Sequence, residues 1–324
     1  MAVELGAVVS EPDIRCIMRI LWSVRLVERT IGVLKVVARN HPCGCYCPTH
    51  RLHRESKSEG LMMGNGVLQD SWDFLRHHLG TFLESPGFLL TAVVLGIYVP
   101  GIMFSAIDVL VTKRMTWRQC CAVYWRAMKW YGTLYIVAVP LMLLVSLPVS
   151  LDVPATAPTS VEFVRDLLLY FLVGDFFSYW WHRLEHENSW YATRVHRVHH
   201  ADHPPLSIWT AMVVHPVEGF SVFIFFHLYG IVFPIHTLTF AVAAFAMTAV
   251  TMVTHCGYRL PVYDSIFAHA AAHDLHHTNR KPTNISVVLT LCDWLFGTHQ
   301  QAKYPREPRR EHIGSTGALD TTSP

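Results

Sequence analysis

Three clusters of histidine are the residues of this chain most able to do chemistry. They read HRLEH at 182–186, HRVHH at 196–200 and HDLHH at 273–277, in a sequence with 21 His among 324 residues. Residues three and four positions apart share one face of a helix, so we expect each HxxHH to present three imidazoles together and HxxxH to present two. Neutral imidazole is a common metal ligand, and the pattern therefore predicts a metal site.

The number of imidazoles in these clusters indicates two metal ions. One ion takes about six ligands at most, and a catalytic ion keeps one position open. Imidazole suits zinc, copper, iron or nickel, and oxidation chemistry beside a bilayer favours iron and O2. Asp175 lies two helical turns before His182, where we expect it to orient the second nitrogen of a ligand. The candidate ligands are His182, His186, His196, His199, His200, His273, His276 and His277.

The composition of the chain indicates that a membrane protein must position these histidines. Hydrophobic residues make up 52% of the chain and charged residues only 15%, whereas about 25% of the residues of soluble proteins are charged. The net charge of +2 excludes the large basic excess of a nucleic-acid-binding protein. Low hydrophobicity and high net charge, which are typical of disordered chains, are also absent. We therefore expect a folded membrane protein with no nucleic-acid partner.

Four apolar regions are candidates for the membrane-spanning helices. Residues 88–111, 130–151 and 161–181 are each predicted to form one span, since helices of about 20 residues cover the roughly 30 Å hydrocarbon core. Residues 219–254 lack Asp, Glu, Lys and Arg, and Pro234 divides them, which predicts a hairpin of two short helices. The fold class that we predict is all-α: a polytopic membrane protein with about four spans or hairpin spans and a His-rich helical cap.

The distribution of charge predicts how the chain is oriented and divided. Residues 112–129 form a basic loop, which the positive-inside rule places on the cytosolic side together with the His-rich cap. The first 61 residues are more basic than the remainder, and we interpret them as an upstream extension, an artefact of the gene model, before a working start near Met62. The predicted parts are a poorly ordered extension at 1–61, transmembrane helices at 62–160, a catalytic domain at 161–304 and a flexible tail at 305–324.

The histidine clusters and their neighbours resemble the fatty acid hydroxylase/sterol desaturase superfamily of membrane di-iron oxygenases. The supporting stretches are DFFSYWW at 175–181, HPVE at 215–218, HCGYRLP at 255–261 and DWLFGT at 293–298. The resemblance covers roughly residues 163–300 and is highly specific there. A weaker likeness upstream, in SWDFL at 71–75, is to cholesterol 25-hydroxylase-like members, and sterol C-4 methyl oxidases share the HPxE and HDxHH patterns.

The resemblance implies a ligand set and a group of outer residues. It carries the eight histidines above over as ligands and adds His255 as a ninth. Ala272 stands where sterol-acting members often have His, and we interpret the nearby His269 as a bystander. No side chain other than the metal ligands is expected to be catalytic. The candidate outer residues are Asp175, His203, His215, Glu218, His269 and Asp274.

The resemblance also implies the reaction and its partners. Two non-haem iron ions would use O2 as co-substrate to hydroxylate an unactivated C–H bond of an apolar lipid, with a sterol favoured. The electrons must come from outside, because the chain has neither a GxGxxG fingerprint nor a CxxCH haem attachment. The resemblance implies cytochrome b5 or a similar carrier fed by NAD(P)H. It places the site at the cytosolic face of the endoplasmic reticulum membrane.

Other functions remain open at the level of sequence. Sterol C-4 methyl oxidation, sterol desaturation and fatty-acyl hydroxylation all use this histidine frame, and the shape of the pocket decides between them. HRLEH also matches the HxxEH motif of zinc peptidases, with Glu185 as base, although that function leaves the two HxxHH clusters unexplained. A membrane metal-binding or transport protein would need a polar path through its spans. The two predicted spans within residues 88–151 offer only Asp108, Arg126 and Lys129 at their edges.

Overall fold

The computed structural model describes residues 65–146, 153–204, 206–221, 235–279 and 281–304. Within these ranges the regular structure is helical, with one isolated β-bridge between Phe267 and Leu289. The predicted all-α class is therefore confirmed. The extension predicted at 1–61 and the tail predicted at 305–324 lie outside the described residues, and the four-part division of the chain stays a prediction.

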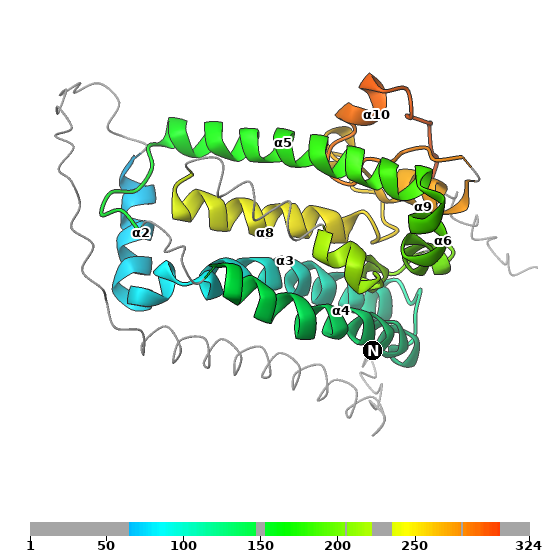
Figure 1. The fold of residues 1–324 in the computed structure, drawn as a ribbon, viewed down its shortest axis with the longest axis horizontal. Helices are drawn as coiled ribbons and strands as arrows, with labels where there is room; N and C mark the ends of the chain where they lie inside the picture. The colour runs from blue at the N-terminus through cyan, green and yellow to red at the C-terminus, as the bar shows by residue number, and fades with distance from the viewer. Residues whose placement is uncertain (1–64, 147–152, 205, 222–234, 280, 305–324) are drawn as a thin grey trace, which may run out of the picture.

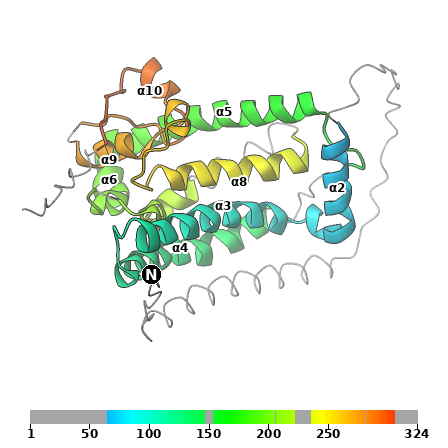
Figure 2. The ribbon, with the colours of Figure 1, turned by 180° about the vertical axis from the view of Figure 1, so that it is seen from behind.

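Four long helices run alongside one another and form the body of the molecule. Helix α8 lies between α5 and α3 in two opposite views, and α4 adjoins α3 (Figures 1 and 2). Helix α3 continues into one π-helical turn, η2, at Ile107–Val111. The long helices are α3 (Pro86–Ala106), α4 (Trp117–Ser146), α5 (Ser160–Glu187) and α8 (Thr237–Val253).

Shorter elements close the two ends of this body. Helix α2 (Asn65–Leu79) and the 3₁₀ turn η1 (Gly80–Glu84) lie at the end where α5 begins, and α6, α9 and α10 lie at the opposite end (Figure 1). The remaining short elements are α6 (Ser189–Arg194), η3 (His196–Ala201), η4 (Ile208–Met212), η5 (Tyr263–Ser265), α9 (Ala270–Thr278) and α10 (Leu291–Leu295).

Small residues allow α3 to approach its neighbours closely. A Cβ added at Gly96 would lie 2.6 Å from the carbonyl oxygen of Phe245 on α8, and one added at Gly101 would lie 2.5 Å from the ring of Trp209. Neither contact leaves room for a larger side chain. Because the closely packed interior has few voids, these two glycines set the distance between α3 and the elements that lead to the histidines.

Helix α5 carries the third predicted span directly into the first histidine cluster. It begins with a capping box, in which Thr159 Oγ1 accepts a hydrogen bond from Glu162 N at 3.2 Å and Glu162 Oε2 accepts one from Thr159 N at 2.9 Å. It then continues to Glu187 without a break. His182 and His186 are therefore held on a rigid helix.

The predicted basic loop is shorter than we expected. Helix α4 already begins at Trp117, where Gln119 N donates to Thr116 Oγ1 at 3.3 Å and Gln119 Oε1 accepts from Thr116 N at 2.9 Å. The interpretation of residues 112–129 as a loop was wrong for most of its length. This reciprocal cap starts the helix within the basic segment, which polarity alone did not indicate.

Among the described residues, one helix, Gly87–Val111, is long and apolar enough to cross a membrane. Helix α8 is apolar but shorter. The predicted span at 130–151 falls largely within α4, and residues 222–234 of the predicted hairpin lie outside the description. The arrangement with about four spans therefore stays a prediction.

Candidate metal centre

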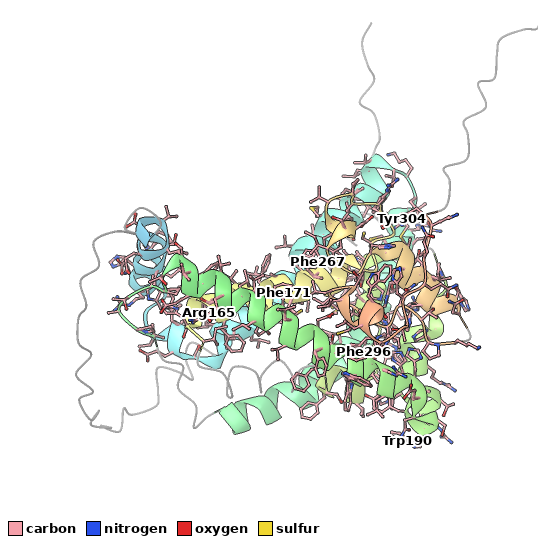
Figure 3. All side chains as sticks on the ribbon, turned by 90° about the horizontal axis from the view of Figure 1, so that it is seen from above. Arg165, Phe171, Trp190, Phe267, Phe296 and Tyr304 are labelled. Atoms are coloured by element: carbon pink, nitrogen blue, oxygen red, sulfur yellow. The ribbon has the colours of Figure 1, made fainter. Side chains whose placement is uncertain are left out.

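Nine imidazoles from four separate segments come together at one end of the helical body. This is the end where α5 terminates and where Trp190, Phe296 and Tyr304 are labelled in Figure 3. The nine residues are those that the sequence predicts as ligands: His182, His186, His196, His199, His200, His255, His273, His276 and His277.

The imidazoles divide into two groups, and the division does not follow the sequence clusters. In each group, one potential ligand atom of every residue lies within 4.8 Å of all the others. Each HxxHH cluster contributes to both groups, so the three imidazoles that one cluster presents are shared between the two groups. Group one comprises His182, His186, His196, His200 and His276, and group two comprises His199, His255, His273 and His277.

The spacing in group one matches that of neighbouring ligands on one ion. His182 Nε2 lies 3.2 Å from His196 Nε2, and His186 Nε2 lies 3.0 Å from His196 Nε2 and 3.1 Å from His276 Nε2. With metal–nitrogen bonds of about 2.0–2.1 Å, nitrogens about 90° apart on one ion are separated by roughly 3.0 Å, and tetrahedral neighbours by roughly 3.4 Å. The nitrogens of group one therefore fit around a single cation.

Group two has the same spacing and is fully buried. His273 Nε2 lies 2.9 Å from His255 Nε2 and 3.1 Å from His277 Nε2. His255 Nε2 also lies 3.4 Å from His199 Nε2. All four side chains belong to the buried interior. A second cation fits here with four imidazole ligands.

Hydrogen bonds on the outer nitrogens leave the inner nitrogens free to bind a metal. His182 Nδ1 donates to the carbonyl oxygen of Ile285 at 2.6 Å, and His276 Nδ1 donates to that of Thr283 at 2.8 Å. A neutral imidazole protonated at Nδ1 presents a bare lone pair at Nε2. These lone pairs face other ring nitrogens at about 3 Å, which is unfavourable without a proton or a cation between them.

A proton is a poor occupant of these sites, because burial favours neutral imidazole. Loss of hydration lowers the pKa of His200 and of His255 to about 3. The same loss, together with the neighbouring His182, lowers the pKa of His186 to about 2. At neutral pH these rings are therefore uncharged, which is the form that binds metal.

Two buried glutamates lie against the outer nitrogen of one group-one histidine. His196 Nδ1 is 3.1 Å from Glu218 Oε1 and 3.5 Å from Glu185 Oε2. Burial raises the pKa of Glu185 to about 8 and that of Glu218 well above its usual range. Carboxylates placed this way commonly orient a metal-binding imidazole and increase its basicity. The predicted outer position of Glu218 agrees with this contact.

The predicted role of Asp175 was wrong. Its Oδ1 accepts a hydrogen bond from Leu289 N at 2.8 Å, whereas the outer nitrogen of His182 donates to Ile285. Seven residues along a helix amount to about 10 Å, so two residues can share a face without reaching the same partner. Asp175 thus secures the 285–289 segment instead of a histidine.

Three of the other predicted outer residues have contacts away from the imidazoles. His215 Nδ1 accepts from Val217 N at 3.2 Å, and His269 Nδ1 accepts from Ala272 N at 3.2 Å, so both histidines cap the start of a helix. The capping role explains why His269 is a bystander to the metal site. His203 lines a cavity of about 220 Å³ with Arg114 and Arg126.

Asp274, the remaining predicted outer residue, sits beside two ligands in sequence but packs elsewhere. Burial raises its pKa to about 6, and the backbone of Leu206 hydrogen-bonds to it. Leu206 lies between η3 and η4. Asp274 therefore joins two segments that carry ligands.

Asp293 supports the site, although sequence reasoning noted it only as part of a motif. Its buried carboxylate accepts from Ile285 N at 2.8 Å, from Ser286 N at 3.1 Å and from Thr298 Oγ1 at 2.7 Å. Ile285 is the residue whose carbonyl oxygen binds His182. Asp293 thus shapes the segment that orients this ligand, and only the DWLFGT match signalled it.

The buried carboxylate of Asp108 is part of a network that holds the segment after His255. Asp108 accepts from Arg114 Nη2 at 3.0 Å and from the hydroxyl of Tyr258 at 2.5 Å. Arg114 Nη2 also donates to the carbonyl oxygen of Cys256 at 2.9 Å. Gly257 has a φ of +72°, and a Cβ there would collide with the Arg114 guanidinium. This network ties the end of α3 to the residue beside a ligand.

Comparison with known proteins identifies the family. The sequence model of the fatty acid hydroxylase family matches residues 167–298, which include all nine histidines. A cholesterol 25-hydroxylase-like protein of Caenorhabditis briggsae is 30% identical over 249 residues, which cover 72% of this chain and 82% of that protein. The chain belongs to the fatty acid hydroxylase family. The superfamily resemblance stated above is thereby confirmed.

Other relatives of this fatty acid hydroxylase family member carry different names. Methylsterol monooxygenase 1-1 of Arabidopsis thaliana is 29% identical over 185 residues, covering 54% of this chain and 61% of that protein. A very-long-chain aldehyde decarbonylase of Oryza sativa subsp. japonica is 30% identical over 193 residues, which cover 57% of this chain and 62% of that protein. No solved structure matches the chain. The family membership makes this chain an enzyme, and its hydroxylase and monooxygenase relatives make it an oxidoreductase.

Proposed function

We propose that this protein is a membrane-bound, non-haem di-iron oxygenase that hydroxylates an apolar lipid, most simply a sterol. The observation that carries the proposal is the division of nine buried or half-buried imidazoles into groups of five and four. Each group has nitrogens at the spacing of ligands on one ion. Groups one and two would each hold one iron, and bound iron would supply the activation of O2.

The residues of the chain would position this chemistry without taking part as acids or nucleophiles. The carbonyl oxygens of Ile285 and Thr283 keep two ligands in the tautomer that leaves Nε2 free. Glu218 does the same for His196. The buried setting excludes bulk water, which strengthens the electrostatic interactions within it.

A sterol substrate is supported by the names of two relatives, a cholesterol 25-hydroxylase-like protein and a methylsterol monooxygenase. The chain lacks a dinucleotide fingerprint, and we propose cytochrome b5 or a similar NAD(P)H-fed carrier as the electron donor. We also propose that the metal centre faces the cytosol at the endoplasmic reticulum membrane. Sterol C-4 methyl oxidation, sterol desaturation and fatty-acyl hydroxylation are the alternatives that use the same centre.

The zinc-peptidase alternative receives no support from the position of Glu185. A peptidase base must face the open position of the metal, on the Nε2 side of its ligands. Glu185 instead lies 3.5 Å from the Nδ1 atom of His196. The carboxylates of Glu185 and Glu218 both lie at this outer nitrogen of His196, and the five residues of group one are all histidines. A metal transporter would leave the close, buried packing of both groups without a purpose.

The test is metal analysis combined with lipid mass spectrometry. The chain is expressed in microsomes of defined sterol content with O2 and NADPH, and the purified protein is analysed for metal. We expect about two irons per chain and a sterol that has gained one oxygen atom. A product lacking two hydrogens would indicate desaturation, and unchanged sterols with an altered acyl pool would reject the sterol substrate. Metal flux into liposomes without oxidation would overturn the proposal.

A further inference from the structure

We propose that α10 is an anchor that inserts into the interfacial region of the lipid bilayer, beside the metal centre. Its outward residues are apolar, whereas Cys292 and Asp293 on its inner side are buried. Trp294 and Leu295 are each 66% exposed, which is unusual for large apolar side chains at neighbouring positions. The α10 apolar face consists of Leu291, Trp294, Leu295 and Phe296.

We infer that the lipid bilayer covers the α10 apolar face, because this face is continuous with the exposed surface of α5. Between Arg165 and Arg183, every exposed residue of α5 is apolar. This interval spans about 27 Å, close to the roughly 30 Å thickness of the hydrocarbon core. The exposed residues are Leu168, Leu169, Leu172, Phe176, Phe177 and Trp180.

The order of residue types along α5 matches the passage from hydrocarbon to headgroups. Its exposed side chains are leucines first and then aromatic residues, before the ion pair of Arg183 Nε with Glu187 Oε1 at 2.7 Å. Tyrosine and tryptophan belts mark the membrane–water interface, and charges lie beyond it. The level of Trp180 on α5 is therefore the level of the interface.

Phe296 joins the α10 apolar face to α5 at this level. Its ring centroid lies 4.9 Å from that of Trp180 and 6.4 Å from that of Phe176, and Figure 3 shows Phe296 over α5. Leu291, Trp294 and Leu295 extend the same apolar surface sideways. Tryptophan is enriched at the membrane–water interface, and Trp294 lies at the centre of this surface.

The inner side of α10 connects this anchor to the metal centre. Asp293 holds the backbone of Ile285, whose carbonyl oxygen accepts a hydrogen bond from His182. The anchor therefore fixes the height of the ligand set relative to the bilayer from which an apolar substrate arrives. The inference rests on the membrane location in the proposed function, but it does not depend on iron or on turnover.

The test measures quenching of tryptophan fluorescence by lipids with brominated acyl chains. The full chain is reconstituted in phosphatidylcholine vesicles with or without bromine, as wild type, Trp294→Phe and Trp190→Phe. Trp190 is the matched control, because it is also well exposed but follows Arg183 and Glu187 on α6. We expect Trp294→Phe to reduce the bromolipid-quenched intensity by about one tryptophan's share and Trp190→Phe to leave it unchanged.

Three results would overturn the proposal. The quenched intensity could stay the same in Trp294→Phe, or fall equally in both variants. Trp294 could also be protected from bromolipid and from aqueous acrylamide together, which would mean that a second copy of the chain covers the face. Equal thermal unfolding midpoints for the three proteins would verify that each is folded. Since the readout needs no turnover, an inactive oxygenase with a quenched Trp294 would reject the proposed function and leave the anchor intact.

Discussion

The two histidine groups differ most in what holds their outer nitrogens. In group one, His182 and His276 donate to backbone carbonyl oxygens, and His196 faces Glu218. In group two, only His255 has a partner for Nδ1 among the described residues, the hydroxyl of Thr254 at 3.0 Å. The outer nitrogens without a partner in that part of the structure belong to His199, His273 and His277.

Two groups with similar spacing between their ring nitrogens can therefore differ in how many of their imidazoles are oriented by hydrogen bonds. Three of the five imidazoles of group one, those of His182, His196 and His276, are oriented by the protein before any metal binds, which increases metal affinity. Those of group two lack that orientation, and a buried donor without a partner costs about 1–3 kcal/mol. We therefore expect group two to depend more on its ion for its geometry and to lose that ion first during chelation.

The largest effect is expected from removing one ligand of each group. His276→Ala in group one and His273→Ala in group two should each reduce activity by more than about 100-fold, since the loss of one ligand exceeds the loss of an outer contact. Iron content should fall in both variants. His269→Ala is the matched control, because His269 belongs to neither group; its ring caps α9 and lies against Tyr304, and its loss should cost about 1 kcal/mol of stability. Full activity in either ligand variant would refute the ligand assignment.

The next effect is the pH dependence of the metal-free protein. The pKa of His255 is lowered to about 3 in the folded state by burial, whereas its unfolded value is about 6.5. The unfolded chain therefore binds more protons between these values, and the stability is fully present above about pH 6.5. We expect the unfolding midpoint to fall as the pH decreases below about 6.5.

The histidines of both groups should contribute to this loss of stability at low pH, and bound metal should reduce the loss. Bound ions compete with protons for the same nitrogens, so the loaded protein should unfold at a lower pH than the metal-free protein. The measurement is the denaturant midpoint, followed from neutral to acidic pH in each form. A metal-free protein that gained stability on acidification would contradict the neutral state of these histidines.

A smaller effect is expected from the outer carboxylate of group one. Glu218→Gln should weaken metal binding to group one by about 10–100-fold, because an amide orients His196 less strongly than a carboxylate does. Group two should keep its affinity. Metal titration of the two sites separates these outcomes. Glu185→Gln is the comparison variant, and its longer contact of 3.5 Å predicts a smaller loss. An equal loss at both sites would show that the groups are not independent.

The smallest effect is expected at Asp293, which is two contacts away from the candidate ligand His182. Asp293→Asn should reduce the free energy of unfolding by about 1–3 kcal/mol, since it weakens bonds to buried backbone donors. Because Ile285 orients His182, metal affinity should fall in group one alone. Chemical denaturation and metal titration measure the two quantities. A change confined to group two would contradict the connection through Ile285.

The nine histidines that meet in the two groups were all predicted from the sequence: eight from residue type and spacing, and His255 from the family resemblance. The chain is apolar and carries three histidine clusters at helical spacing, a pattern that favours metal binding. Buried imidazoles are neutral, and where they meet, their nitrogen lone pairs face one another and can be shared by a cation. The all-α class followed equally directly, because long apolar segments without charges favour helices. The start of α4 was missed, since a reciprocal cap at Thr116 outweighed the polarity of the segment.

The distribution of ligands between two groups was decided by tertiary structure. His196 and His199 are neighbours on η3, yet they belong to different groups, because α5 approaches one of them and the end of α8 approaches the other. The same reason applies to Asp175, whose partner Leu289 is 114 residues away in sequence. Local spacing determines which residues can act together, and only the packing of distant segments determines which of them do.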